Sequence, residues 1–181
     1  MKIACLGWGS LVWDPGELSL RTEWLPDGPT IRVEFVRQSG KENGRITLVI
    51  FPTAEPVIAK WAEINSDDLD QAAEMLRHRE GKPHRHHIGQ WKVGQADPAS
   101  LPGISEWAAD RDVDAVIWTA LPPKFKGTEG RVPSVEEVAA YLNGLPEGPR
   151  AEALRYIRNA PTQIDTVYRR ELAVLVPATV P

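Results

Sequence analysis

The sequence is poor in cysteine, in long apolar runs and in excess charge of either sign. Cys5 is the only cysteine among 181 residues, which excludes an internal disulfide and a metal cluster built from several thiolates. No run approaches the 18 apolar residues of a transmembrane helix, so we expect no membrane partner. The net charge is −4 and the isoelectric point is about 5.6, so we expect no nucleic-acid partner.

The N-terminal residues also lack the apolar core of a signal peptide, because Gly7 and Gly9 follow the start too closely. A reducing, cytoplasmic location is therefore expected. The hydrophobic fraction of 42% and the charged fraction of 25% are typical of a globular protein, and we treat residues 1–181 as a single domain. Tryptophan is unusually frequent, with seven residues against three phenylalanines and three tyrosines. This predicts large amphipathic side chains along a core edge or a pocket.

The spacing of apolar residues predicts strands first and helices later. Strands are expected at 2–6, 31–35, 46–51, 56–64, 87–93, 113–119 and 171–176, with a hairpin turn at Asn43-Gly44. Residues 56–64 also fit a helix, and we prefer the strand. Helices are expected at 66–80, at 104–110, at 134–144 behind a capping box, and from Pro149 through Ile157. No regular strand–helix–strand alternation is present, which favours an α+β fold.

A glycine-containing turn, Gly7 to Leu11, directly follows the first predicted strand. Glycines there let the backbone bend sharply and present consecutive N–H groups to an anion. Val12 occupies the position of the third glycine in a dinucleotide-binding motif, so that motif is excluded. Two interpretations stay open at this point, an anion cradle and a tight turn without a ligand.

Glu80 ends the apolar stripe of the helix predicted at 66–80. At about 100° per residue it lies about 20° from Leu69 around the axis and in line with Leu76. Burying a carboxylate is unfavourable unless it is paired or hydrogen-bonded, so a buried Glu80 is a candidate general base. The alternative is a helix that frays before this position, with Glu80 paired to an arginine at the surface.

All four histidines fall within ten residues: His78, His84, His86 and His87. In an extended segment His84 and His86 share a face and His87 points the other way. A pair of this kind plus a distant carboxylate could bind zinc or iron, although His78 lies opposite Glu80 on the helix. Five lysines and arginines between positions 77 and 92 favour a solvated basic patch instead, and we assign no metal ligand.

Three segments resemble, in order and rough spacing, motifs of the gamma-glutamylcyclotransferase-like superfamily, and its ChaC-type glutathione-degrading branch most closely. They are Trp8-Gly9-Ser10-Leu11-Val12-Trp13, Gly44-Arg45-Ile46-Thr47-Leu48-Val49 and Arg79-Glu80-Gly81. Trp8 stands where the branch has tyrosine, and the family's tyrosine beyond the glutamate is absent after Gly81. The resemblance covers about the first 90 residues.

The resemblance implies a small, mainly antiparallel β-barrel with surrounding helices, a central first strand, and the turn at its mouth. It also implies an enzyme that cyclises a small gamma-glutamyl-type substrate to 5-oxoproline without a cofactor, with Glu80 as general base. The expected substrate-binding residues are Gly7, Trp8, Gly9, Ser10, Leu11 and Arg37. A homodimer is left open. The alternatives are a non-catalytic binding module on the same fold and a metal-dependent enzyme that uses His84, His86 and His87.

Overall fold

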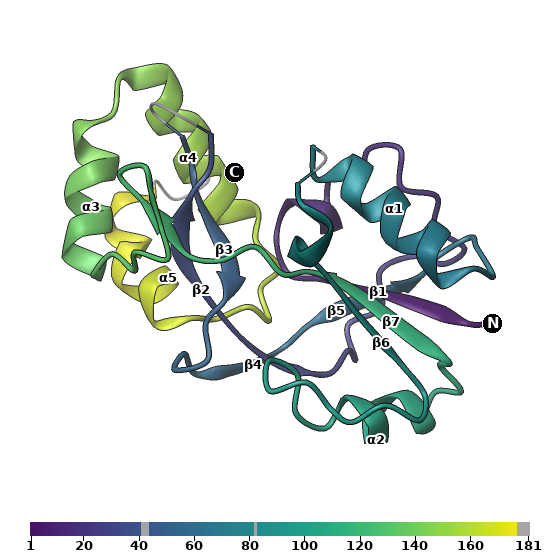
Figure 1. Cartoon of the computed structure of the whole chain (residues 1–181). Coiled ribbons are helices and arrows are strands. Elements are labelled where there is room, and N and C mark those ends of the chain that lie inside the picture. The colour runs from purple at the N-terminus through teal and green to yellow at the C-terminus, as the bar shows by residue number, and fades with distance from the viewer. Residues whose placement is uncertain (41–43, 82, 177–181) are drawn as a thin grey trace.

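The computed structural model describes residues 1–40, 44–81 and 83–176 (Figure 1). The strands are β1 (Ile3–Gly7), β2 (Thr30–Gln38), β3 (Ile46–Ile50), β4 (Pro56–Ile58), β5 (Lys60–Glu63), β6 (Ile88–Lys92), β7 (Ala115–Thr119), β8 (Lys124–Phe125) and β9 (Thr128–Glu129). The α-helices are α1 (Leu69–Arg79), α2 (Ile104–Ala109), α3 (Val135–Gly144), α4 (Glu147–Asn159) and α5 (Val167–Leu172). Short 3-10 turns occupy Ser10–Val12, Arg85–His87 and Ala173–Leu175.

The first sheet has the strand order β5-β1-β7-β6. Strand β1 is buried along its whole length because it lies between antiparallel β5 and parallel β7. Helix α1 packs on β6 and β7 through Ala72, Ala73 and Leu76. The Asp68 side chain accepts a hydrogen bond from the Gln71 N–H at the start of this helix, which fixes where α1 begins.

The second sheet has the order β3-β2-β8-β9, and β4 pairs with the first residues of β2. Helix α4 contacts β3, and α5 contacts β2 (Figure 1). One cluster of buried side chains joins both sheets, running from Leu6 on β1 through Phe35 on β2 to Leu142 on α3. The two sheets therefore share a core.

The α+β class agrees with the expectation, and the central position of the first strand is confirmed. The barrel is confirmed only in part. Most strand pairs are antiparallel, but β1 with β7 and β2 with β8 are parallel, and the strands fall into two sheets instead of one closed cylinder.

The strand expected at 171–176 is wrong. This segment contains the end of α5 and the 3-10 turn Ala173–Leu175. The Thr166 side chain accepts a hydrogen bond from the Arg169 N–H and starts a helix that buries Leu172, so the apolar run after it has no strand partner. The expected strand at 56–64 is divided into β4 and β5 by Ala59, and Asn43 of the expected hairpin turn lies outside the described residues.

Candidate active site

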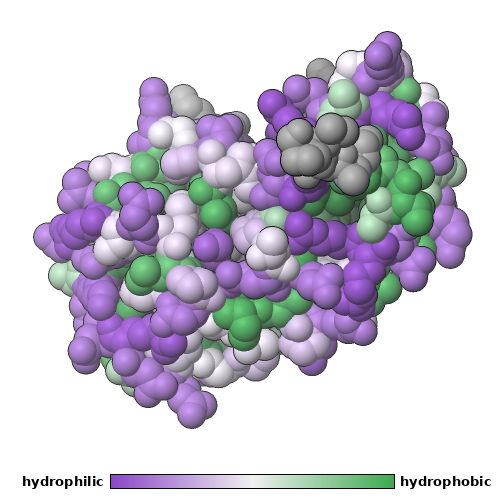
Figure 2. Space-filling model, turned by 180° about the vertical axis from the view of Figure 1, so that it is seen from behind, coloured by the Kyte–Doolittle hydropathy of each residue, from purple (hydrophilic) through white to green (hydrophobic). Residues whose placement is uncertain are grey.

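A cavity of about 470 Å³ lies where the two sheets meet. Its walls come from the turn after β1, the end of β2, the start of β3, the residues at the end of α1, and α4. Seen from behind, the outline of the molecule is notched between its two halves (Figure 2). The residues that line this cavity include the expected general base and all the expected substrate-binding residues: Gly7, Trp8, Gly9, Ser10, Leu11, Arg37 and Glu80. His84, His86 and His87 of the metal-dependent alternative are not among them.

Close contacts explain the glycines of the turn. A Cβ atom at Gly7 would lie 2.6 Å from the ring of Trp24 and 2.9 Å from Val12. A Cβ atom at Gly9 would collide with the hydroxyl oxygen of Tyr156. Gly9 precedes the 3-10 turn, and its carbonyl oxygen accepts a hydrogen bond from the Val12 N–H at 3.0 Å. At Gly7 and Gly9 the turn therefore has no room for a side chain.

Trp8 and Leu11 anchor the turn on either side. Trp8 is buried, and its indole N–H donates to the Leu48 carbonyl oxygen on β3 at 3.4 Å. Leu11 is buried against the side chains under α1. The Trp13 ring packs edge-on against Tyr156, with ring centroids 5.3 Å apart. The turn is thus fixed to both sheets, one on each side of the cavity.

Glu80 caps the end of α1, and its side chain is 16% exposed. Its Oε1 atom lies 2.8 Å from Nη1 of Arg79, whose side chain is 13% exposed. Arg79 also donates to the Ser10 hydroxyl at 3.3 Å and, through Nε, to the Asp14 carbonyl oxygen at 3.2 Å. Glu80 does pair with an arginine, as the alternative stated, but the pair is mostly buried beside the turn instead of lying at the surface. One guanidinium group therefore holds the carboxylate and the turn together.

Two further guanidinium groups line the cavity. Arg37 on β2 donates to the Pro122 carbonyl oxygen at 2.6 Å, and burial lowers its pKa. Arg45 lies over the ring of Tyr156 at 5.4 Å. Within residues 1–40, 44–81 and 83–176, neither has a carboxylate at ion-pair distance. Three arginines against one glutamate make the cavity attractive to an anionic ligand.

Tyr156 on α4 is not among the residues predicted from the sequence. It is 5% exposed and lines the cavity. Its hydroxyl oxygen accepts a hydrogen bond from the Leu48 N–H at 3.4 Å. Burial raises the pKa of Tyr156 to about 12, so the phenol is protonated at neutral pH. The sequence signal was a tyrosine on the apolar face of α4, which is also typical of an ordinary core residue.

Cys5 does not supply a nucleophile. The residue is fully buried, and burial raises the pKa of its thiol. The thiolate is the reactive form of cysteine, and Cys5 is not among the described residues that line the cavity, so we assign it no role there.

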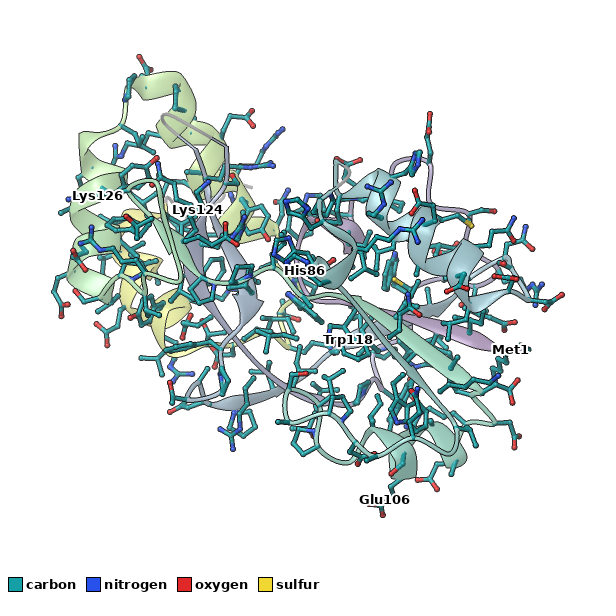
Figure 3. The ribbon with its side chains drawn as sticks, viewed as in Figure 1. Met1, His86, Glu106, Trp118, Lys124 and Lys126 are labelled. Carbon is teal, nitrogen blue, oxygen red and sulfur yellow. The ribbon has the colours of Figure 1, made fainter. Side chains whose placement is uncertain are left out.

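The histidines are arranged differently from the expectation. Residues 85–87 form a 3-10 turn, so the extended geometry is wrong and the rings of His84, His86 and His87 gather together. The His84 and His86 rings stack 5.4 Å apart at 7°. Figure 3 shows His86 between the two halves of the molecule. His78 lies apart from them and pairs with Glu74 at 3.1 Å. In the part of the chain that the structure describes, no three His, Cys, Asp or Glu side chains are grouped to hold a metal ion.

No protein-family model and no curated protein matches the sequence. A match exists among solved structures: the crystal structure of a gamma-glutamyl cyclotransferase specific to glutathione, from yeast. The match covers 97% of this chain and 98% of the yeast chain, with a TM-score of 0.54 and 15% sequence identity. The chain has the gamma-glutamylcyclotransferase-like fold. At this level of identity the likeness extends to the fold alone.

Among the described residues, no helix is both long and apolar enough to span a bilayer.

Proposed function

We propose that this protein is a gamma-glutamyl cyclotransferase that releases 5-oxoproline from a small gamma-glutamyl amide or peptide. The observation that carries this proposal is the arrangement of Glu80 and the Gly7–Leu11 turn around one cavity. Arg79 joins the two parts of this arrangement, because it pairs with Glu80 and also donates a hydrogen bond to Ser10 of the turn, 69 positions away along the chain. The shared fold with the yeast enzyme and the ChaC-type motifs support the same function.

The proposed mechanism uses Glu80 as the general base. Its carboxylate removes a proton from the substrate's α-amine, and the amine nitrogen then attacks the γ-carbonyl carbon. A new C–N bond closes the five-membered ring, and the amide C–N bond breaks. The proton passes from Glu80 to the leaving nitrogen, so the atoms of 5-oxoproline and the released amine equal those of the substrate. No water or redox partner is consumed.

The positive charge of the cavity suits the substrate. A gamma-glutamyl group carries an α-carboxylate, and guanidinium groups bind carboxylates through strong charge-assisted hydrogen bonds. We assign this role to Arg37 and Arg45, which face the cavity without a carboxylate partner among the described residues. Glutathione carries a second carboxylate at its far end and is the first substrate to test.

The experiment compares Glu80→Gln with the wild type in 5-oxoproline release from glutathione and a panel of gamma-glutamyl amines. Glutamine keeps the shape and cannot accept the proton, so we expect turnover to fall about 10²–10⁴-fold. Glu63→Gln is the matched control, because Glu63 is 17% exposed and pairs with Arg21 at 2.9 Å outside the cavity. Its turnover should equal that of the wild type.

Near-normal turnover in Glu80→Gln contradicts the proposed mechanism. If His84→Ala and His86→Ala lose activity instead, the metal-dependent alternative gains support. If gamma-glutamyl compounds bind to the wild type without any product, the non-catalytic binding module is the better description.

A further inference from the structure

Tyr156 lines the cavity, and among the described residues its hydroxyl group has a partner for its oxygen and none for its proton. The Leu48 N–H donates to the oxygen at 3.4 Å. In the described part of the chain, no group accepts a hydrogen bond from this hydroxyl. Buried polar groups are nearly always hydrogen-bonded, and a donor left without an acceptor is unfavourable. The proton of this hydroxyl is therefore available to a ligand in the cavity.

The ring of Tyr156 is held in place from several sides. Phe35 and Trp13 pack edge-on, with centroids at 6.3 and 5.3 Å, and Arg45 covers the ring face at 5.4 Å. The hydroxyl also lies so close to Gly9 that no Cβ atom fits there. The donor is thus positioned before any ligand binds, which is what stabilisation of a developing charge requires.

We propose that Tyr156 donates a hydrogen bond to the γ-carbonyl oxygen of the substrate and stabilises the oxyanion of the tetrahedral intermediate. This inference rests on the proposed function. Arg37 and Arg45 offer charged donors for substrate carboxylates, which leaves the neutral hydroxyl for the carbonyl oxygen. The phenol keeps its proton throughout, and Glu80 alone accepts and returns one.

The first test is Tyr156→Phe, which removes the hydroxyl and keeps the ring. We expect kcat to fall about 10²–10³-fold, as when one oxyanion donor is removed, with KM changed only a few-fold. Tyr141→Phe is the matched control: its hydroxyl donates to the Gly44 carbonyl oxygen at 2.7 Å and accepts from Gln38 at 3.1 Å, outside the cavity lining. An unchanged kcat in Tyr156→Phe, or a raised KM with normal kcat, overturns the inference.

A binding experiment tests the same contact without turnover. The probe is L-2-amino-4-phosphonobutyrate, in which a tetrahedral phosphonate replaces the γ-carboxylate of glutamate, and glutamate is the planar reference. By calorimetry, the wild type should prefer the phosphonate, and Tyr156→Phe should lose about tenfold of that preference, the effect of one hydrogen bond to a charged group. A preference retained in the variant overturns the inference.

The two proposals fail separately. A wild type that releases no 5-oxoproline but shows the tyrosine-dependent phosphonate preference overturns the proposed function and keeps the contact. If the wild type binds neither probe, both proposals are overturned.

If Tyr156→Phe does not fold, 3,5-difluorotyrosine at position 156 replaces it. That residue keeps the ring and lowers the phenol pKa, so kcat should fall on the alkaline side at a lower pH than in the wild type, and an unshifted profile overturns the inference.

Discussion

At the scale of single residues, Gly9 and Tyr156 are coupled by contact. An added methyl group at Gly9 would collide with the Tyr156 hydroxyl oxygen, whereas the ring carbon behind it is 3.4 Å away. We expect Gly9→Ala to lower the free energy of unfolding by about 1–3 kcal/mol, the usual effect of overpacking, and to reduce turnover. Thermal melts and 5-oxoproline release measure both effects.

The double variant Gly9→Ala/Tyr156→Phe should be more stable than Gly9→Ala alone. Removing the hydroxyl removes the collision, so much of the lost stability should return while turnover stays low. Such non-additivity is expected for residues in contact. Additive losses of stability in the double variant would show that Gly9 is constrained by something other than this hydroxyl.

The sequence predicted Glu80 and the turn because both carry local signals. A carboxylate at the end of an apolar stripe is anomalous, and glycines directly after a buried strand indicate a sharp bend. Tyr156 carries no such signal, since a tyrosine among Ala153, Leu154 and Ile157 is typical of an ordinary core residue. Its proposed role depends on a contact between α4 and the turn, which periodicity along the chain does not encode.

At the scale of elements, a buried carboxylate fastens α5 to the second sheet. Glu34 on β2 is 2% exposed and accepts hydrogen bonds from the Thr166 hydroxyl at 2.5 Å, the Phe35 N–H at 2.9 Å and the Tyr168 N–H at 3.2 Å. This contact replaces the strand expected at 171–176. A short run of apolar residues fits a strand or a helix equally well. Here the Thr166 side chain caps the first turn and favours the helix.

We expect Glu34→Gln to destabilise the protein by about 1–3 kcal/mol, because the amide nitrogen would face the Tyr168 N–H and leave a buried donor unpaired. Denaturant unfolding measures this loss. Glu55→Gln is the control, since Glu55 is exposed and pairs with Arg170 on α5 at 2.7 Å. Exposed pairs contribute little, so its stability should match that of the wild type.

The effect of Glu34→Gln should depend on pH. Burial raises the pKa of Glu34 above 4.5, so the folded state binds its proton more tightly than the unfolded state. The stability from this group is full below pH 4.5 and falls as pH rises through the folded-state pKa. Glutamine does not titrate, and the difference between wild type and variant should therefore be larger at pH 4 than at pH 7. A difference that grows with pH would contradict this assignment.

At the scale of the whole molecule, the shared core predicts one cooperative unfolding transition. The seven tryptophans lie in or beside the first sheet and its connections, whereas α3, α4 and α5 cover the second sheet. Tryptophan fluorescence therefore follows mainly the first sheet and the turn beside the cavity, whereas far-ultraviolet circular dichroism follows the helices on both sheets. We expect their thermal transitions to coincide, as they do for a single domain. Two separate midpoints would contradict a single domain at residues 1–181.

The contact between the N-terminal turn and α4 also determines when the cavity can form during synthesis of the chain. A ribosome adding 5–20 residues per second needs on the order of ten seconds to make the roughly 150 residues between Gly9 and Tyr156. Strand β1 likewise cannot pair with its parallel neighbour β7 until residues 115–119 have been made. Glu80 is made about halfway through that interval, and from then until Tyr156 follows, Glu80 and the turn have no opposite wall. The nascent polypeptide can therefore complete the walls of this cavity only after α4 has been synthesised.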